Sequence, residues 1–267
     1  DGDRYASGKT VDAAWQGGLD VVPLVGVGYA QVPAVWLEQY GHIVADLLSA
    51  RGDDGALPRY ALPDVAELSK ALGEAPPPDF AELEPLLEGF EKVPTIDPPD
   101  GLANVLRPYQ LRGASWLAFT RTAGLGAVLA DDMGLGKTLQ ALTVMDGKTL
   151  VVCPRSLIWT WASEAERFRP SLKVSVYHGA RRKLDLDADL IITTYAILRL
   201  DLASLGEHHW DMVVLDEAQA IKNPDSQAAR AASDLDADYK VALTGTPVEN
   251  RLEELWSLRH FVCPGLL

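Results

Sequence analysis

The stretch "DDMGLGKT", residues 131–138, combines a lysine, a threonine and two glycines at a spacing that could bind phosphate. Backbone N–H groups of such a turn, and of the helix that follows it, point at phosphate oxygens. Lys137 would neutralise the terminal phosphates and the Thr138 hydroxyl would ligate Mg²⁺. Gly134 and Gly136 allow a close approach that side chains would block. These four residues are therefore candidates for holding a nucleotide and its metal ion.

One position departs from the usual pattern, because Asp131 stands where the first glycine of such a loop belongs. An aspartate is tolerable there if it begins the turn with an ordinary backbone conformation, since the phosphate contacts come from later residues. The alternative interpretation is a glycine turn that arose by chance.

A nucleotide site also needs an acidic pair at the end of another apolar strand, and "MVVLDEAQ" supplies one. Asp216 would hold Mg²⁺ through water, and Glu217 would orient or deprotonate an attacking water. A lone acidic pair after a strand is more often a helix cap. Residues 131–138, which we call the lysine loop, occur in the same chain, and this coincidence favours the nucleotide site.

A third apolar run, "VALTGTPVEN", ends in small hydroxyl residues. Thr244 and Thr246 would lie beside the γ-phosphate, where they could sense the state of the nucleotide. The alternative is a turn with a hydrogen bond from a side-chain hydroxyl.

A fourth run, "VVCPRSLIWTWASEAERF", places Arg155 and Ser156 at a strand end and the start of a helix, where they could contact a nucleic-acid backbone. A capped helix with a buried Trp159 or Trp161 is equally compatible. The basic run "HGARRKLD" could add a DNA contact, although a solvated charge run is the favoured interpretation.

These groups meet only if one sheet brings the strand ends together. After residue 100, short apolar runs alternate with helical stretches, and each run predicts a buried strand: "GAVLAD", "TLVVCP", "KVSVYH", "DLIITTY", "MVVLDE" and "YKVALTG". This alternation indicates a parallel sheet covered by helices on both faces. Ligands then bind at the carboxyl ends of the strands.

The chain has 267 residues, which favours two parts. The proline-rich "VPTIDPPDG" separates an acidic part from a balanced one: residues 1–100 carry 6 basic and 18 acidic side chains, against 18 and 20 in residues 101–267. We expect a boundary near residue 100. Before it, "VPAVWLEQYGHIVADLLSA" and "LPDVAELSKALG" predict amphipathic helices, and "GLDVVPLVGVGYAQVP" predicts one or two strands. Most of the overall charge of −14 lies in residues 1–100, so electrostatic repulsion disfavours nucleic-acid binding by the acidic part. The same argument does not apply to residues 101–267.

Only two cysteines occur, far apart in the sequence, which fits a reducing compartment. The longest apolar region is interrupted by prolines and glycines, and no basic segment precedes a signal-peptide core. We therefore expect a cytoplasmic protein with no membrane span and no secretion.

The ordered motifs resemble the first motor lobe of helicase superfamily two, and more narrowly the Swi/Snf-type ATPases that translocate on double-stranded DNA. The match is carried by "LRPYQLRGASWL", "DDMGLGKT", "LVVCPRSLIWTW", "LIITTY", "LDEAQAIKN" and "LTGTPVENRLEELWSL", which together span nearly all of residues 103–267. The resemblance implies an α/β fold, a RecA-like P-loop three-layer sandwich with a parallel sheet, that binds ATP and Mg²⁺. Residues 1–100 resemble the small, mostly helical accessory module of bacterial HepA/RapA-like members.

The resemblance also implies residue roles. Gln110 is assigned to adenine recognition, for which an amide can both donate and accept hydrogen bonds. Lys137, Thr138, Asp216 and Glu217 take the roles inferred above, and Thr194 joins Arg155 and Ser156 as a DNA contact. An acidic residue at position 131 is common in the family. Gln219 replaces the histidine of the DEAH form, and its amide can still hydrogen-bond between motifs. The connection "VMDGKTLVV" is short for the family.

The implied activity is that of an ATP-dependent double-stranded-DNA translocase that remodels or displaces DNA-bound protein. Family motors hold ATP between two RecA-like lobes, and the second lobe brings an arginine. Residues 101–267 correspond to the first lobe, so we expect this chain alone to bind Mg-ATP weakly and to hydrolyse it poorly. The implied partners are double-stranded DNA, the second lobe, and RNA polymerase or another DNA-bound protein. An RNA or single-strand helicase and a non-catalytic nucleotide-switched interaction module are the alternatives.

Overall fold

The computed structural model describes residues 6–25, 28–31, 34–52, 55–81, 83, 85, 92–99, 101–245 and 252–264. The chain divides into two compact units, Asp1–Leu87 and Glu88–Leu267. The proline-rich segment around residue 96 therefore belongs to the second unit and precedes its first helix. There the backbone N–H of Ile96 donates a hydrogen bond of 3.2 Å to Ser115 Oγ, and Leu102 is fully buried. This segment is packed against the second unit and does not form a free linker.

The first unit contains a short hairpin and helices. In chain order its elements are α1 (Gly8–Gln16), β1 (Val21–Pro23), β2 (Tyr29–Gln31), α2 (Ala34–Ala50), the 3-10 turn η1 (Arg59–Ala61) and α3 (Leu62–Ala71). The strands β1 and β2 pair antiparallel, and Ala14, Val22 and Leu37 form one buried apolar cluster. Helices α1 and α2 approach so closely that a Cβ at Gly41 would lie 2.5 Å from the Trp15 ring, and a glycine at this position leaves room for the ring. The two predicted helices and the strand pair are confirmed, whereas α1 was not predicted.

The second unit is built on a six-stranded sheet. Its elements are α5 (Pro108–Thr122), β3 (Ala127–Leu129), α6 (Lys137–Val144), β4 (Thr149–Cys153), η3 (Arg155–Leu157), α7 (Ile158–Phe168), β5 (Val174–Val176), β6 (Leu190–Thr194), α8 (Tyr195–Leu200), α9 (Leu202–Leu205), β7 (Met212–Asp216), η4 (Ala218–Ile221), α10 (Gln227–Ser233), β8 (Lys240–Leu243) and α11 (Leu252–Val262). The strand order is β3-β8-β7-β4-β6-β5, and every pair is parallel. Each of the six apolar runs predicted as a strand contains one of these strands.

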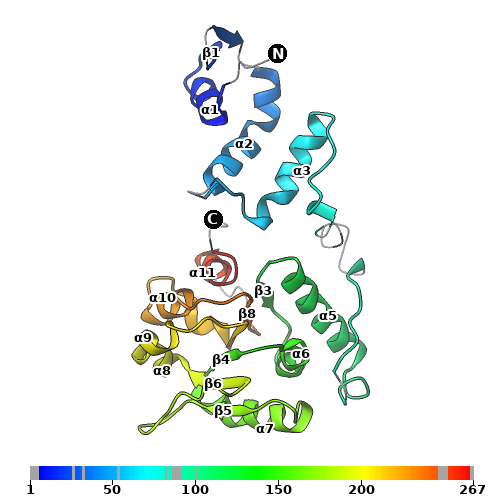
Figure 1. Cartoon of the computed structure of the whole chain (residues 1–267), viewed down its shortest axis with the longest axis vertical. Helices are drawn as coiled ribbons and strands as arrows, with labels where there is room; N and C mark the ends of the chain where they lie inside the picture. The colour runs from blue at the N-terminus through cyan, green and yellow to red at the C-terminus, as the bar shows by residue number, and fades with distance from the viewer. Residues whose placement is uncertain are drawn as a thin grey trace. The chain divides into compact units, whose positions relative to one another are not determined.

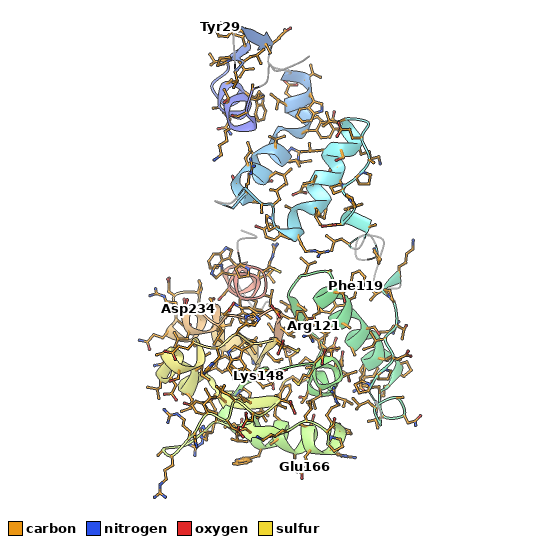
Figure 2. The ribbon with its side chains drawn as sticks, in the orientation of Figure 1. Tyr29, Phe119, Arg121, Lys148, Glu166 and Asp234 are labelled. Carbon is orange, nitrogen blue, oxygen red and sulfur yellow. The ribbon has the colours of Figure 1, made fainter. Side chains whose placement is uncertain are left out.

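Side chains of successive strand residues belong to two separate core clusters. Figure 2 draws the side chains as sticks on the ribbon. In β4, Leu150 and Val152 pack with α8, α9, α10 and α11, whereas Val151 and Cys153 pack with α5, α6 and α7. Figure 1 shows these two groups of helices on opposite sides of the sheet. A strand buried on both faces must be apolar at every position, which explains the continuous apolar runs. The predicted RecA-like three-layer α/β fold is confirmed.

The short connection between α6 and β4 is a tight turn held by one carboxylate. Gly147 has φ +74°, and a Cβ there would lie 2.4 Å from Asp211 Oδ2. The same oxygen accepts a hydrogen bond of 2.6 Å from the backbone N–H of Lys148. Four residues therefore suffice to return the chain to the sheet. Among the described residues, no helix is both long and apolar enough to cross a membrane.

Candidate functional site

The lysine loop leaves the carboxyl end of β3 and leads directly into α6. Gly134 and Gly136 have φ of +83° and +77°, in the left-handed region that glycine adopts without strain. Lys137 is the first residue of α6, and its Nζ donates to the backbone oxygens of Asp131 at 2.6 Å and Asp132 at 3.1 Å. The ammonium group thus lies inside the loop, where a phosphate could replace these two carbonyl acceptors.

Asp131 starts the loop without backbone strain. Among the described residues, Glu217 is the sole non-glycine residue with a positive φ, so Asp131 keeps an ordinary conformation, as expected. Its Oδ2 accepts a hydrogen bond of 3.0 Å from Gln140 Nε2 on α6. The aspartate therefore ties the start of the loop to the helix that follows it.

Gln110 on α5 holds the loop from the other side. Its Oε1 accepts from the backbone N–H of Arg107 at 2.9 Å, and its Nε2 donates to the backbone oxygen of Leu135 at 3.1 Å. A Cβ at Gly136 would lie 2.4 Å from this Nε2, so glycine is needed there for the approach of Gln110 as well as for its own backbone. The role of Gln110 in adenine recognition stays a prediction.

Asp216 ends β7 and is only 6% exposed. Its Oδ2 accepts a hydrogen bond of 2.8 Å from the indole Nε1 of Trp161, and its Oδ1 accepts one of 2.9 Å from the backbone N–H of Glu217. Its backbone oxygen accepts from the Tyr195 hydroxyl at 2.8 Å. Neither the Trp161 contact nor the Tyr195 contact was predicted from sequence.

The electrostatics around Asp216 are governed by burial. Burial raises the pKa of the Asp216 carboxyl, while its hydrogen bonds with Trp161 and Glu217 and the nearby charge of Lys137 lower it. Burial, together with the charge of Asp216, also raises the pKa of Glu164 on α7. A carboxylate in such surroundings is stabilised by a positive charge. Lys137 and a bound cation are charges of that kind.

Glu217 follows in a left-handed conformation, with φ +49° and ψ +54°. Such a conformation in a non-glycine residue is uncommon and is often found at functional sites. Gln219 Nε2 donates a hydrogen bond of 2.6 Å to Glu217 Oε2, and Thr244 Oγ1 donates one of 3.1 Å to Gln219 Oε1. The expectation that the Gln219 amide hydrogen-bonds between motifs is confirmed. Thr246 lies outside the described residues.

The predicted nucleic-acid contacts differ in exposure. Arg155 and Ser156 lie in η3 and are exposed at the carboxyl end of β4, and Trp159 beyond them is 68% exposed. Thr194 is 4% exposed, and its hydroxyl caps α8 by accepting from the backbone N–H of Ile197 at 3.3 Å. The DNA-binding roles of Arg155, Ser156 and Thr194 stay predictions, of which the first two involve exposed side chains.

The basic run after β5 is partly neutralised. Arg182 forms an ion pair with Asp201, which also accepts a hydrogen bond of 2.6 Å from the Tyr177 hydroxyl. Arg181 and Lys183 on either side are exposed. Arg182 therefore fixes the loop, whereas its two neighbours carry charge into solvent.

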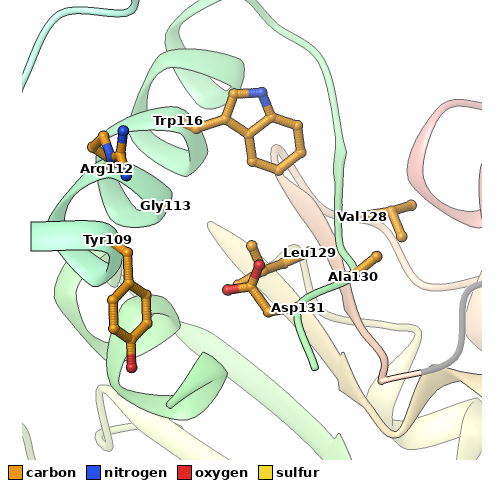
Figure 3. Close-up of a pocket in the computed structure, with 8 residues that line it drawn as sticks. All are labelled: Tyr109, Arg112, Gly113, Trp116, Val128, Leu129, Ala130 and Asp131. Atoms are coloured by element: carbon orange, nitrogen blue, oxygen red, sulfur yellow. The ribbon is translucent and has the colours of Figure 1, made fainter. Parts of the chain in front are cut away.

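A hollow of about 540 Å³ adjoins the loop. It lies between α5 and the end of β3, and Figure 3 shows the Asp131 carboxylate pointing toward α5. Its lining residues are Tyr109, Arg112, Gly113, Trp116, Val128, Leu129, Ala130 and Asp131. Lys137 and Asp216 are not among them. The hollow is therefore beside the candidate phosphate site and is not identical with it.

A parallel sheet with a glycine-lysine-threonine loop after one strand and an acidic pair after another defines a RecA-like lobe of the P-loop class. Residues 109–267, more than half of the chain, match the SNF2-related domain. The protein therefore belongs to the SNF2-related domain family.

Two curated relatives illustrate the similarity. The chain is 38% identical over 197 residues to YwqA of Bacillus subtilis, which covers 68% of this chain and 21% of that protein. It is 38% identical over 196 residues to the TATA-binding protein-associated factor MOT1 of Saccharomyces cerevisiae, with 63% and 10% covered. The chain thus spans about one fifth or less of the length of these relatives.

Two solved structures share the fold. The SWI2/SNF2 ATPase core of Sulfolobus solfataricus in complex with double-stranded DNA is 44% identical, with a TM-score of 0.61, and covers 64% of this chain and 38% of that one. The same organism's SWI2/SNF2 ATPase core domain is 42% identical, with a TM-score of 0.57 and 67% and 38% covered. The chain therefore shares its fold with part of a SWI2/SNF2 ATPase core.

Proposed function

We propose that this chain is the first RecA-like lobe of an ATP-dependent motor that tracks along double-stranded DNA and remodels or displaces DNA-bound protein. The observation that carries the proposal is the hydrogen-bonded link from Glu217 through Gln219 to Thr244. This link lies at the carboxyl ends of the parallel strands, where the lysine loop also begins. A structural carboxylate cap would need no such link between two strand ends. A lobe that reports nucleotide state to its surroundings would need one.

The residues present fit a nucleotide with Mg²⁺. Each oxygen of the buried Asp216 carboxylate has one hydrogen-bond donor and keeps acceptor capacity, as a metal-bound water would require. Thr138 and Asp216 would hold the ion, which when bound would neutralise phosphate charge. Lys137 would bind the terminal phosphates. Glu217, with its Oε2 held by Gln219, would orient the attacking water.

The exposed end of β4 supports a nucleic-acid contact. Arg155 and Ser156 lie there in η3, and a cationic side chain together with free N–H groups at a helix start can bind a phosphate backbone. A homologous core that is 44% identical has been solved in complex with double-stranded DNA. This similarity favours duplex DNA over RNA as the polymer.

Residues 1–100 would then be an accessory module of the HepA/RapA-like kind, and residues 101–267 the motor lobe. The chain spans 38% of each solved SWI2/SNF2 core, which leaves room in those chains for a second lobe. We infer that a second lobe supplies the arginine that completes the site. An arginine brought across such a cleft contributes roughly 10³–10⁵ in rate in related phosphoryl-transfer systems. This chain by itself would therefore hydrolyse ATP poorly.

Equilibrium binding of Mg-ATP to this chain tests the nucleotide site. Lys137→Ala should weaken binding by at least about tenfold, because it removes a charged hydrogen-bond donor from the phosphates. Lys148→Ala is the matched control, since Lys148 lies in the turn before β4, at the amino end of that strand, whereas the lysine loop follows the carboxyl end of β3. Equal affinities for all three proteins would contradict the assignment of the loop.

A further inference from the structure

A buried indole connects α7 to the acidic end of β7. Trp161 is 1% exposed, and its Nε1 donates a hydrogen bond of 2.8 Å to Asp216 Oδ2. Since the backbone N–H of Glu217 occupies Oδ1 at 2.9 Å, the two donors fix both oxygens of the carboxylate. The orientation of the carboxylate is therefore set by one side chain and one backbone group.

The indole itself has little freedom to move. Ile158, Trp161 and Ala165 follow helical spacing on the inner side of α7, and all three are buried in the core cluster that includes Val151 and Cys153 of β4. A close-packed interior holds such a ring in one rotamer. The N–H is consequently a donor with a fixed direction, and the carboxylate must turn toward it.

A buried indole N–H needs an acceptor in any protein, but the acceptor need not be a functional group. Trp210 of the same chain shows the more common arrangement. It is fully buried, and its Nε1 donates a hydrogen bond of 3.1 Å to the backbone oxygen of Leu205. Trp161 instead uses the carboxylate that is the candidate ligand for the metal. An indole can only donate, so it leaves the remaining acceptor sites of this carboxylate available.

We propose that Trp161 is a positioning residue, whose N–H holds the Asp216 carboxylate in the orientation that binds Mg²⁺ together with a nucleotide. This inference rests on the proposed function, because it assumes that Asp216 serves a metal-nucleotide complex. Hydrogen-bond partners that orient metal ligands are part of a metal site, and their removal typically lowers metal affinity or activity by about 10–100-fold. Trp161→Phe removes the N–H and keeps an aromatic ring in the core.

The test is calorimetric binding of ADP to this chain, in Mg²⁺ and in EDTA, for wild type and three variants. Trp161→Phe should weaken Mg-ADP binding about tenfold and leave binding in EDTA within about twofold of wild type. Trp159→Phe makes the same substitution two residues earlier, at a ring that is 68% exposed. Trp210→Phe removes a buried indole hydrogen bond away from the site. Both controls should retain the wild-type ratio of the two affinities.

A mutant cycle with Asp216→Asn identifies the route of the effect. If the indole acts through the carboxylate, Trp161→Phe should cause no further loss of Mg-ADP affinity in the Asp216→Asn background. Thermal unfolding without nucleotide measures the general loss of packing, which we expect for both Trp161→Phe and Trp210→Phe. Only Trp161→Phe should also lose the higher affinity for ADP that Mg²⁺ provides.

The possible failures are distinguishable. A wild-type chain that binds ADP no better in Mg²⁺ than in EDTA would contradict the proposed nucleotide site, and the role of Trp161 with it. A wild-type chain with a Mg²⁺ advantage that Trp161→Phe retains in full would overturn the role of Trp161 alone. An equal further loss in the Asp216→Asn background would also overturn it.

Discussion

Thr244 Oγ1 donates a hydrogen bond of 3.1 Å to Gln219 Oε1, which joins the end of β8 to the segment that follows β7. The same amide donates from Nε2 to Glu217 Oε2 at 2.6 Å. One side chain therefore bridges the acidic pair and the threonine, 25 residues apart from Gln219 in the sequence. A displacement of Thr244 would be transmitted to the carboxylate of Glu217.

Thr244→Val removes the hydroxyl and retains the shape of the side chain. We expect kcat for ATP hydrolysis by a protein containing both lobes to fall about tenfold, as for loss of one hydrogen bond in a network to a charged group. KM should change less than kcat. Thr143→Val is the control, because the Thr143 hydroxyl donates a hydrogen bond of 2.7 Å to the backbone oxygen of Leu139 within its own helix. An unchanged kcat would show that the bridge carries no catalytic role.

The lysine loop should be more sensitive at Gly136 than at Gly134. Both glycines have positive φ, so an alanine at either position costs about 1–2 kcal/mol of stability. A Cβ at Gly134 meets nothing within 4 Å, whereas one at Gly136 lies 2.4 Å from Gln110 Nε2. In urea unfolding, Gly136→Ala should therefore destabilise more than Gly134→Ala. Adding Gln110→Ala should remove the difference, and a persistent difference would contradict this explanation.

His209 should make stability depend on pH. Its Nδ1 lies 2.8 Å from Asp236 Oδ2 and its Nε2 lies 3.1 Å from Asp238 Oδ1, and these hydrogen bonds raise the pKa of the histidine. A raised pKa in the folded state stabilises the fold below the unfolded value of about 6.5, and this contribution disappears as pH rises through the folded value. His209→Asn should therefore lower the unfolding midpoint at pH 5.5 and have a smaller effect at pH 9. A difference that is constant with pH would refute the ion pairs.

Tyr239 should be a stability residue of the second unit. Tyr239 is 1% exposed, and its hydroxyl donates a hydrogen bond of 2.8 Å to the backbone oxygen of Leu117. The same hydroxyl lies 2.8 Å from Thr120 Oγ1. Tyr239→Phe should lower the free energy of unfolding by about 1–2 kcal/mol, because buried acceptors lose a donor. The double variant Thr120→Val, Tyr239→Phe should lose less free energy of unfolding than the sum of the losses in the two single variants, since the two hydroxyls share hydrogen-bond partners. Full additivity would argue against a shared network.

The sheet could be predicted because its strands are buried on both faces and are therefore continuous apolar runs. The strand order could not, since no run specifies its neighbour. The contact of Trp161 with Asp216 spans 55 residues and depends on that order: β4 and β7 are adjacent, with Val152 opposite Leu215. The sequence therefore predicted both segments of the site without predicting how they meet.

Other features depended on contacts between elements that the sequence pattern does not encode. Helix α1 has few large apolar residues, and its position depends on Trp15 packing over Gly41. The proline-rich segment around Ile96 was predicted to separate the two parts of the chain, and the structure adds that its backbone N–H donates a hydrogen bond to Ser115 on α5. In both cases tertiary packing, and not local propensity, determined the structure.

The central claim is tested most directly by ATP hydrolysis of a protein in which this chain is joined to the second lobe proposed for it. Rates are measured with duplex DNA, single-stranded DNA, RNA and no polymer, in wild type and in Glu217→Gln. We predict that duplex DNA stimulates hydrolysis above the other polymers and that Glu217→Gln abolishes the stimulated rate. Stimulation by RNA or single strands alone would point to a helicase of another kind. Equal rates in every condition would contradict the motor and leave a nucleotide-switched interaction module.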